Sequence, residues 1–329
     1  MPKSVGQVPY TVAVLVPCYN EEKTIGQVVT SFKSAIPHAV VYVYDNHSMD
    51  QTSARAKTAG AVVGYEIHSG KGNVVRRMFA DIEADVYVLV DGDDTYDAFS
   101  APEMIQKLID EKLDMVVGTR LTEHDAMAFR KGHRFGNDLL TGFMGFLFGK
   151  SFTDILSGYR VFSRRFVKSF PALSKGFETE SELTIHALEM RMPTGEVITP
   201  YKSRPSESQS KLRTYQDGFR ILVTILGLFK EERPLTAFTI LFACLALLSM
   251  ALAVPVILTY METGLVPRFP TAILSTGIMV LAFLSLTSGI VLETVTRGRK
   301  EMKRMGYLSI PVFKGQYSEF SSQDSEEKR

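Results

Sequence analysis

The stretch Val86-Tyr87-Val88-Leu89-Val90-Asp91-Gly92-Asp93-Asp94 decides the fold. Its first five residues are apolar without a break, which is typical of a strand buried on both faces of a parallel sheet. The strand is then followed at once by aspartates, and ligands of open α/β sheets bind beyond the carboxyl ends of the strands. Two aspartates separated by one residue therefore predict a site for a divalent cation and a diphosphate. The alternative for the same aspartates is a solvated acidic turn that binds no ligand.

Strand and helix signals alternate on both sides of this stretch. Apolar strands are predicted at residues 12–16, 40–44, 61–65, 86–90 and 115–117, and helices at residues 21–34, 52–59, 72–83 and 102–111. Such βα alternation predicts an α/β fold with a mostly parallel sheet and helices on both faces.

Composition excludes several classes of protein. The 37 Lys and Arg nearly balance the 36 Asp and Glu, so nothing favours a nucleic-acid binder. Cys18 and Cys244 lie far apart in different surroundings, so we expect no disulfide framework, which fits a reducing compartment. Residues 1–9 have no apolar core, so we expect no cleavable signal peptide.

Two long apolar runs, residues 235–260 and 269–292, contain no charged residue. Each exceeds the roughly 20 residues that cross a hydrocarbon core of about 30 Å. With the short connector 261–268 they predict a transmembrane helical hairpin, and two buried helices of a soluble core are the alternative. The connector carries only one basic residue, Arg268, whereas the outer flanks of the two runs carry Lys230, Arg233, Arg297, Arg299, Lys300, Lys303 and Arg304. Because positive residues stay cytoplasmic, we expect the large N-terminal part and both termini in the cytoplasm.

Four segments are predicted from these patterns. Residues 1–210 form a cytoplasmic α/β domain, and residues 211–233 a juxtamembrane amphipathic helix that lies in the membrane interface. Packing of that helix on the α/β domain is the alternative. Residues 234–296 hold the two membrane helices, and residues 297–329 a basic cytoplasmic stretch with a disordered tail.

Polar strings follow four successive strands of the predicted sheet. They are residues 17–22 (Pro-Cys-Tyr-Asn-Glu-Glu), 45–52 (Asp-Asn-His-Ser-Met-Asp-Gln-Thr), 70–72 (Gly-Lys-Gly) and 91–93 (Asp-Gly-Asp). Each alone is typical of a turn or a helix start. All four at one edge of one sheet outline a single pocket.

With Gly118-Thr119-Arg120, residues 154–160 (Asp-Ile-Leu-Ser-Gly-Tyr-Arg) and Ser210-Lys211-Leu212, these strings carry a family resemblance. Over residues 11–210 the chain resembles the family-two glycosyltransferases of the GT-A (Rossmann-like) fold. Within that family it looks like the polyprenyl-phosphate hexosyltransferases, the group of dolichyl-phosphate mannose synthase and bactoprenol glucosyltransferase. Those enzymes transfer a hexose from a nucleotide diphosphate sugar to a membrane lipid phosphate.

The resemblance assigns residues to the donor. The nucleobase and ribose pocket that it implies is lined by Pro17, Tyr19, Glu21 and Asp45. It also implies that Lys71 lies close to the nucleotide, and that Asp91 and Asp93 hold the nucleotide and a Mg²⁺ or Mn²⁺ that bridges the diphosphate. Such a cation would offset charge on the departing nucleoside diphosphate. Asp94 is expected either as a further acid near the metal or as a solvated turn residue.

The acceptor is an anion that must be placed beside another anion, and arginine binds phosphate oxygens bidentately. By resemblance, Arg120 and Arg134 bind the acceptor phosphate, with Asn137 nearby and Lys211 on a loop that closes over the diphosphate. Surface ion pairs are the alternative for the arginines. For Lys211 the alternative is a basic patch attracted to anionic lipid.

Three acidic residues complete the implied site. Asp154 stands where the resembled enzymes place a catalytic base, and Asp93 and Arg120 are the other expected catalytic residues. A phosphate monoester has a second pKa of about 6, so the acceptor oxygen is already largely deprotonated at neutral pH. Asp154 is therefore expected to be essential, whether as a base, by orienting the acceptor or by stabilising positive charge on the sugar. Glu178 and Glu180 are expected to contact sugar hydroxyls, with exposed helical charge as the alternative.

The sequence thus predicts an inverting, metal-dependent hexosyltransferase at the membrane. UDP-glucose or a related UDP-hexose is the favoured donor and undecaprenyl or dolichyl phosphate the acceptor. The alternatives are a GDP-mannose donor, a non-prenyl lipid acceptor, and a non-enzymatic nucleotide-sugar-binding scaffold. The chain contains no tryptophan, so it lacks the Gln-x-x-Arg-Trp motif of processive synthases, and one sugar per event is expected. A homodimer or homotetramer is left open.

Overall fold

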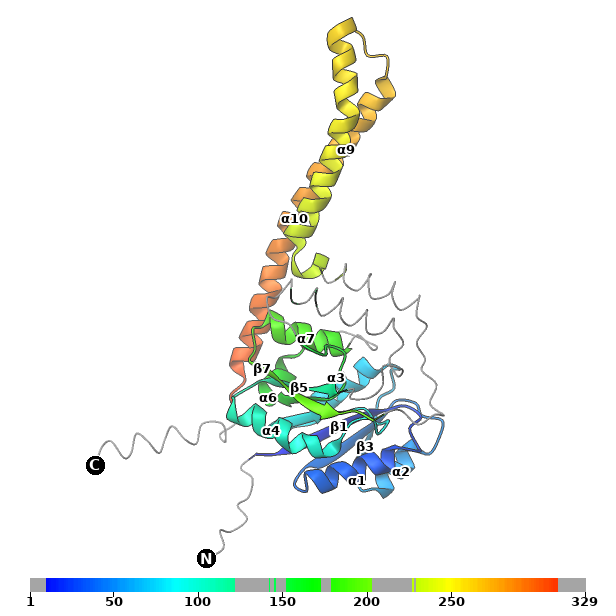
Figure 1. Ribbon diagram of the computed structural model, residues 1–329, viewed down its shortest axis with the longest axis vertical. Helices are drawn as coiled ribbons and strands as arrows, with labels where there is room; N and C mark the ends of the chain where they lie inside the picture. The colour runs from blue at the N-terminus through cyan, green and yellow to red at the C-terminus, as the bar shows by residue number, and fades with distance from the viewer. Residues whose placement is uncertain are drawn as a thin grey trace, which may run out of the picture. The chain divides into compact units, whose positions relative to one another are not determined.

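The computed structural model of the protein describes residues 10–121, 152–172, 179–202 and 229–312, together with Gly142, Gly145 and Gly227. The chain divides into two compact units, each shown in Figure 1. The first comprises residues 1–214 and 303–329, and the second comprises residues 215–302.

A seven-stranded sheet in the order β3-β2-β1-β4-β6-β5-β7 forms the centre of the first unit (Figure 1). Its strands are β1 (Val12–Cys18), β2 (Val40–Asp45), β3 (Val62–Tyr65), β4 (Val86–Leu89), β5 (Met115–Leu121), β6 (Arg160–Ser163) and β7 (Thr194–Pro200). Only β6 runs antiparallel to its neighbours, β4 and β5. The predicted mostly parallel sheet is confirmed, although the sequence reading did not find β6 and β7.

Within the described residues, seven helical segments flank these strands. They are α1 (Ile25–Ala35), α2 (Thr52–Thr58), α3 (Lys71–Asp81), η1 (Ala98–Ser100), α4 (Ala101–Asp110), α6 (Arg164–Ser169) and α7 (Thr179–Glu189). The first helix begins later than predicted because the preceding residues form a turn, in which the Glu21 carbonyl accepts the N–H groups of Thr24 and Ile25. The other predicted helices agree to within a few residues.

Two apolar layers cover the faces of the sheet. On one face, side chains of α1 and α4 pack against alternate residues of β1 and β4, including Val14 and Val88, which are fully buried. On the other face, the ring of Phe162 from β6 contacts the ring of Phe79 from α3 and the ring of Phe166 from α6. Burying a side chain of this size stabilises the fold by about 1.5–3 kcal/mol. These layers fix the strand ends from which the polar loops emerge.

The second unit contains the helix α9 (Pro234–Thr263) and the part of the helix α10 (Phe269–Ser309) that precedes residue 303. Both are long and apolar enough to cross a membrane, and only 11% and 17% of their most apolar windows are buried. A core helix of a soluble protein would be mostly buried, so the exposed apolar surface is typical of helices that face lipid. The predicted hairpin therefore agrees with the structure.

Small residues bring the two helices together. The Ser249 hydroxyl donates to the Ser275 carbonyl at 2.7 Å, and the Ser285 hydroxyl to the Phe238 carbonyl at 3.0 Å. At Gly289 an added Cβ would lie 2.7 Å from the Cβ of Phe238, so only glycine permits this approach. Such packing is usual where lipid removes the hydrophobic drive between helices.

The end of α10 differs from the prediction, because the helix continues through the basic stretch to Ser309. Its last turns belong to the first unit: Lys303 Nζ lies 2.6 Å from Glu189 Oε2, and the Tyr307 hydroxyl donates to Asp114 Oδ2 at 2.7 Å. The apolar run ends at residue 292, but Lys, Arg, Glu and Met extend a helix well. Most of the predicted amphipathic helix and the tail from residue 313 lie outside the described residues.

Candidate active site

Hydrogen bonds from side chains to the backbone join the loops that follow β1 and β2. The Asn20 N–H donates to Ser48 Oγ at 2.9 Å, and the Glu21 N–H donates to Thr52 Oγ1 at 2.8 Å. Asp45 is 6% exposed and its Oδ1 accepts the Ser48 N–H at 2.9 Å. Much of the Asp45-to-Thr52 string therefore holds the two loops in place, and the Asp45 carboxylate is engaged within its own loop.

The other residues predicted for the nucleobase pocket occupy different depths. Pro17 is buried within β1. Tyr19 is 47% exposed and Glu21 is half-buried, both directly after the strand end. Tyr19 and Glu21 thus lie at the edge of the sheet where the prediction placed the donor.

Asn46 connects the loop after β2 to the start of α3. Its Nδ2 donates to the carbonyls of Glu66 and His68 at 3.0 and 2.8 Å, and its Oδ1 accepts the Gly70 N–H at 2.7 Å. Gly70 has a φ of 122°, which a residue with a side chain rarely adopts. This turn directs Lys71, the first residue of α3, toward the end of β4.

Lys71 bridges two carboxylates that are far apart in sequence. Its Nζ lies 2.5 Å from Asp91 Oδ1 and 2.5 Å from Glu180 Oε1. Burial disfavours the ammonium charge, but the two carboxylates outweigh burial and raise the pKa of Lys71. Glu180 is 7% exposed, so it is not a surface charge of its helix. The structure thus places the end of β4 and the start of α7 in one site.

Asp93 and Asp94 face different partners. Asp93 is 8% exposed, and its Oδ1 accepts the Thr95 hydroxyl at 2.6 Å. Asp94 has a φ of 56°, typical of a turn, and its Oδ2 lies 3.8 Å from Lys202 Nζ. Among the described residues no cluster of three or more His, Cys, Asp and Glu side chains is placed to hold a metal. Mg²⁺ is commonly held by only one or two carboxylates plus substrate phosphates, so Asp91 and Asp93 are sufficient in number and chemistry as protein ligands for such an ion.

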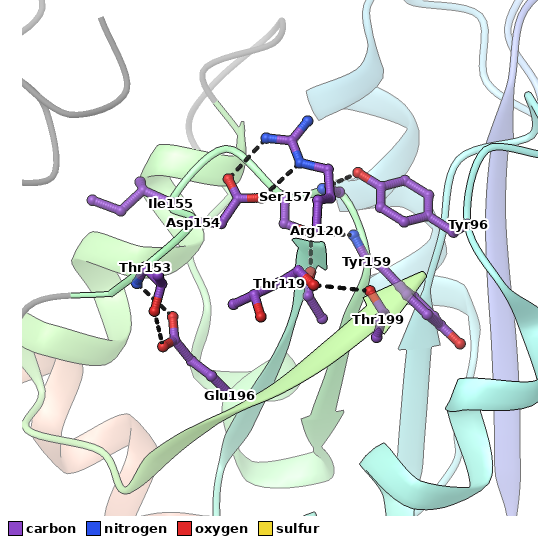
Figure 2. Close-up of polar contacts among 12 residues, drawn as sticks. Tyr96, Thr119, Arg120, Thr153, Asp154, Ile155, Ser157, Tyr159, Glu196 and Thr199 are labelled. Carbon is purple, nitrogen blue, oxygen red and sulfur yellow. Dashed lines mark hydrogen bonds and ion pairs between the residues drawn. The ribbon is translucent and has the colours of Figure 1, made fainter. Parts of the chain in front are cut away.

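Arg120, at the end of β5, forms a two-point ion pair with Asp154 (Figure 2). Its Nε lies 2.6 Å from Asp154 Oδ2 and its Nη2 lies 2.8 Å from Oδ1. The guanidinium also lies over the Tyr201 ring, 5.4 Å from its centroid. Burial opposes the charge, but the hydrogen bond and charge of Asp154 outweigh it and raise the pKa of Arg120. Arg120 is therefore a permanent cation at this edge of the sheet.

The segment from Phe152 to Tyr159, here called the Asp154 loop, joins this ion pair to the Lys71 cluster. At Gly158 an added Cβ would lie 2.5 Å from Asp91 Oδ2 and 3.3 Å from Lys71 Nζ. The Gly158 N–H donates to the Tyr96 hydroxyl at 2.9 Å. One loop thus contributes a carboxylate to one cluster and a close backbone approach to the other.

Gly158→Ala is expected to lower the rate of sugar transfer on the order of 10²-fold, because the new methyl group would displace the Asp91 carboxylate by up to about 1 Å. Initial rates with purified protein check this, together with nucleotide affinity. Gly26→Ala is the matched control, since nothing lies within 4 Å of a Cβ at that position on α1. Equal activity of both variants would contradict the close approach.

Several predicted residues lie outside the described residues: Glu178, Arg134, Asn137 and Lys211. Conversely, sequence reasoning gave no role to Tyr96, Arg160 and Glu196, all of which contact the Asp154 loop. Arg160 closes the Asp-Ile-Leu-Ser-Gly-Tyr-Arg string, which was the only signal for it. Nothing in the sequence marks Tyr96 or Glu196.

Comparisons with known proteins identify the family and agree with the fold. The family model described as glycosyl transferase family 2 matches residues 13–170. Glycosyltransferase AglJ of Haloferax volcanii is 35% identical over 231 residues, which are 70% of this chain and 76% of AglJ. The dolichyl-phosphate hexose transferase of the same organism is 28% identical over 221 residues, 67% of this chain and 95% of that protein.

A solved structure shares the fold. Glucosyl-3-phosphoglycerate synthase from Mycobacterium tuberculosis, crystallised with Mn²⁺, UDP and phosphoglyceric acid, has a TM-score of 0.53 at 22% identity. The match covers 67% of this chain and 78% of the synthase. At this identity the likeness shows the fold alone, and it confirms the predicted GT-A architecture. The chain belongs to glycosyltransferase family 2, and it is a glycosyltransferase.

Proposed function

We propose that the protein transfers a hexose from a nucleotide diphosphate sugar, with UDP-glucose or a similar UDP-hexose favoured, to a polyprenyl phosphate. The observation that carries the proposal is the joining of two charged clusters by the Asp154 loop. One cluster holds Lys71 between Asp91 and Glu180, and the other pairs Arg120 with Asp154. Donor and acceptor need such adjacent sites for a single displacement, which inverts the anomeric carbon. The relative named dolichyl-phosphate hexose transferase supports the same acceptor class.

The donor is assigned to the first cluster. Tyr19, Glu21 and Lys71 lie around the ends of β1 and β4, where the nucleotide would bind. Asp91 and Asp93 would hold a Mg²⁺ or Mn²⁺, which when bound neutralises charge on the leaving nucleoside diphosphate. The complex of the structural neighbour with Mn²⁺ and UDP supports a divalent ion and a uridine nucleotide. Glu180 binds Lys71, which would lie beside the diphosphate, so its carboxylate would be near the hydroxyl groups of the attached sugar.

The acceptor is assigned to the second cluster. Arg120 would bind the lipid phosphate, with Arg134, Asn137 and Lys211 as further partners from outside the described residues. Two N–H groups of Arg120 bind Asp154, so the phosphate would share the guanidinium with this carboxylate or displace it. Asp154 would orient the incoming phosphate or stabilise positive charge on the sugar, because the phosphate is already largely deprotonated at neutral pH.

The membrane hairpin would hold the catalytic domain beside its lipid substrate. The excess of Lys and Arg outside the connector favours a cytoplasmic catalytic domain with both termini on that side. A diacylglycerol acceptor is the rival within the same fold. Transfer of radiolabelled sugar separates the two, because a sugar on a prenyl phosphate is released by mild acid whereas a glycosyl diacylglycerol is not. An acid-stable labelled lipid would contradict the proposal.

Arg134→Ala is expected to raise the KM for polyprenyl phosphate on the order of tenfold while donor binding changes little, because this proposal assigns the Arg134 guanidinium to the acceptor phosphate alone. Kinetics in lipid vesicles measure the first quantity and calorimetry with UDP the second. Arg77→Ala is a suitable control, since Arg77 pairs with Asp81 at the exposed surface of α3. A loss of UDP affinity without a change in acceptor KM would contradict the assignment.

A further inference from the structure

Arg160 is a fully buried cation without an ion-pair partner among the described residues. All of its hydrogen bonds go to neutral acceptors. Nη2 donates to the Ile155 carbonyl at 2.5 Å, Nε to the Ser157 carbonyl at 3.0 Å, and Nη1 to Thr184 Oγ1 at 2.9 Å. A further contact of Nη1 is with Met115 Sδ at 3.5 Å.

A buried charge is a poor means of stabilising a core. Removing an ionised group from water is costly, and well-packed apolar residues of similar volume are often at least as stabilising. The position of the acceptors gives Arg160 another purpose. Ile155 and Ser157 follow Asp154 directly in the Asp154 loop, and the Thr184 hydroxyl donates to the Glu180 carbonyl at 3.1 Å. Arg160 is thus tied to the segments that carry both site carboxylates.

The opposite side of the loop has its own anchor. Glu196 on β7 accepts the Thr153 N–H at 2.7 Å through Oε1 and the Thr153 hydroxyl at 2.5 Å through Oε2 (Figure 2). Asp154 therefore lies between Thr153, which Glu196 of β7 binds, and the Ile155 and Ser157 carbonyls, which Arg160 of β6 binds. A carboxylate fixed on both sides keeps one orientation, which a reacting geometry requires.

We propose that Arg160 and Glu196 are positioning residues that fix Asp154 from its two sides, with Arg160 also fixing Glu180. This inference rests on the proposed function, in which these carboxylates act on sugar and acceptor. Burial lowers the pKa of Arg160 to about 10, with Glu180 and Asp154 opposing the shift, so the guanidinium stays charged at neutral pH. Its fork therefore keeps its full set of donors under working conditions.

Arg160→Lys and Arg160→Met in the full-length protein test the proposal. Lysine keeps the charge but loses the fork, and methionine loses both. For both variants kcat is expected to fall on the order of 10–100-fold, while the donor KM and the affinity for UDP with Mn²⁺ change less than about threefold. Val29→Ala on α1, another fully buried position, is the control for general loss of stability. Rates are compared below the melting temperature of every variant.

A second pair of variants avoids the core. Glutamine at position 196 can keep both hydrogen bonds to Thr153, whereas alanine loses both. Glu196→Gln is therefore expected to lose at most about threefold in kcat and Glu196→Ala at least about tenfold. Glu196 is only half-buried, so both variants are expected to fold even where the Arg160 variants do not.

The outcomes separate this inference from the proposed function. A kcat within twofold of wild type for folded Arg160→Lys, or for Glu196→Ala, would overturn the positioning role. A fall in kcat that matches Val29→Ala at equal loss of melting temperature would do the same. Full activity of Asp154→Asn would instead overturn the role given to Asp154, whatever the Arg160 variants show.

Discussion

Alanine at Asp91 or Asp93 is expected to reduce sugar transfer by 10²–10³-fold or more, on the order of the loss seen when a preorganised group at the developing charge is removed. Asp91 is the carboxylate that Lys71 and Gly158 approach. Asp93, two positions later in the sequence, is buried. With either removed, the diphosphate and its cation would lose a protein ligand. The negative charge that develops on the leaving nucleotide would then be poorly offset.

The measurement is the rate of nucleotide release at saturating donor and acceptor, with Mg²⁺ or Mn²⁺ present. Asp110→Asn, at an exposed acid on α4, controls for the loss of a negative charge elsewhere. Chelation of divalent ions is expected to abolish wild-type activity, and added Mn²⁺ or Mg²⁺ to restore it. Undiminished activity of both alanine variants would contradict the metal assignment.

The second large effect is expected at Asp154. Asp154→Asn should lower kcat by about 10²-fold or more, a loss typical of a group that acts on a transferring oxygen or proton. The amide keeps one acceptor but turns an NH₂ group toward Arg120, so one of the two hydrogen bonds of the pair becomes a clash of donors. Arg120 would then lose its fixed orientation as well as the neighbouring charge.

Nucleotide binding separates this effect from damage to the donor site. The affinity for UDP with Mn²⁺, measured by calorimetry, is expected to stay within about threefold of wild type, because Asp154 belongs to the acceptor cluster. Asp154→Glu, which keeps the charge but lengthens the side chain, should lie between wild type and the asparagine variant. Wild-type kcat in Asp154→Asn would contradict an essential role for this carboxylate.

The sequence was most informative where a single strand or helix consists of one continuous apolar run. The apolar run before Asp91 predicted β4 as a strand buried on both faces, and the uncharged runs predicted α9 and the apolar part of α10. It was least informative for β6 and β7. β6 has four residues and begins with the charged Arg160, and β7 lies at the edge of the sheet, so neither shows an apolar run.

Contacts between distant residues could not be predicted from patterns at all. Lys71 and Glu180 are 109 positions apart, and Thr153 and Glu196 are 43 apart, yet both pairs are in direct contact. The resemblance identified Lys71 and Glu180 separately but gave no sign that they meet. Asp45 was predicted to line the nucleobase and ribose pocket, and nothing in the sequence indicated that its Oδ1 accepts the Ser48 N–H within its own loop.

The central claim is that a cation-bound nucleotide sugar gives up its hexose to a polyprenyl phosphate at this site. Purified full-length protein should be incubated with Mn²⁺ or Mg²⁺, one polyprenyl phosphate and, in turn, UDP-glucose, other UDP-hexoses and GDP-mannose, and the released nucleotide measured. We predict that a UDP-hexose releases its nucleotide only when the lipid phosphate and the ion are both present. The amount of nucleotide released should equal the amount of acid-labile glycolipid formed. Absence of acceptor-dependent release with every one of these donors would contradict the account.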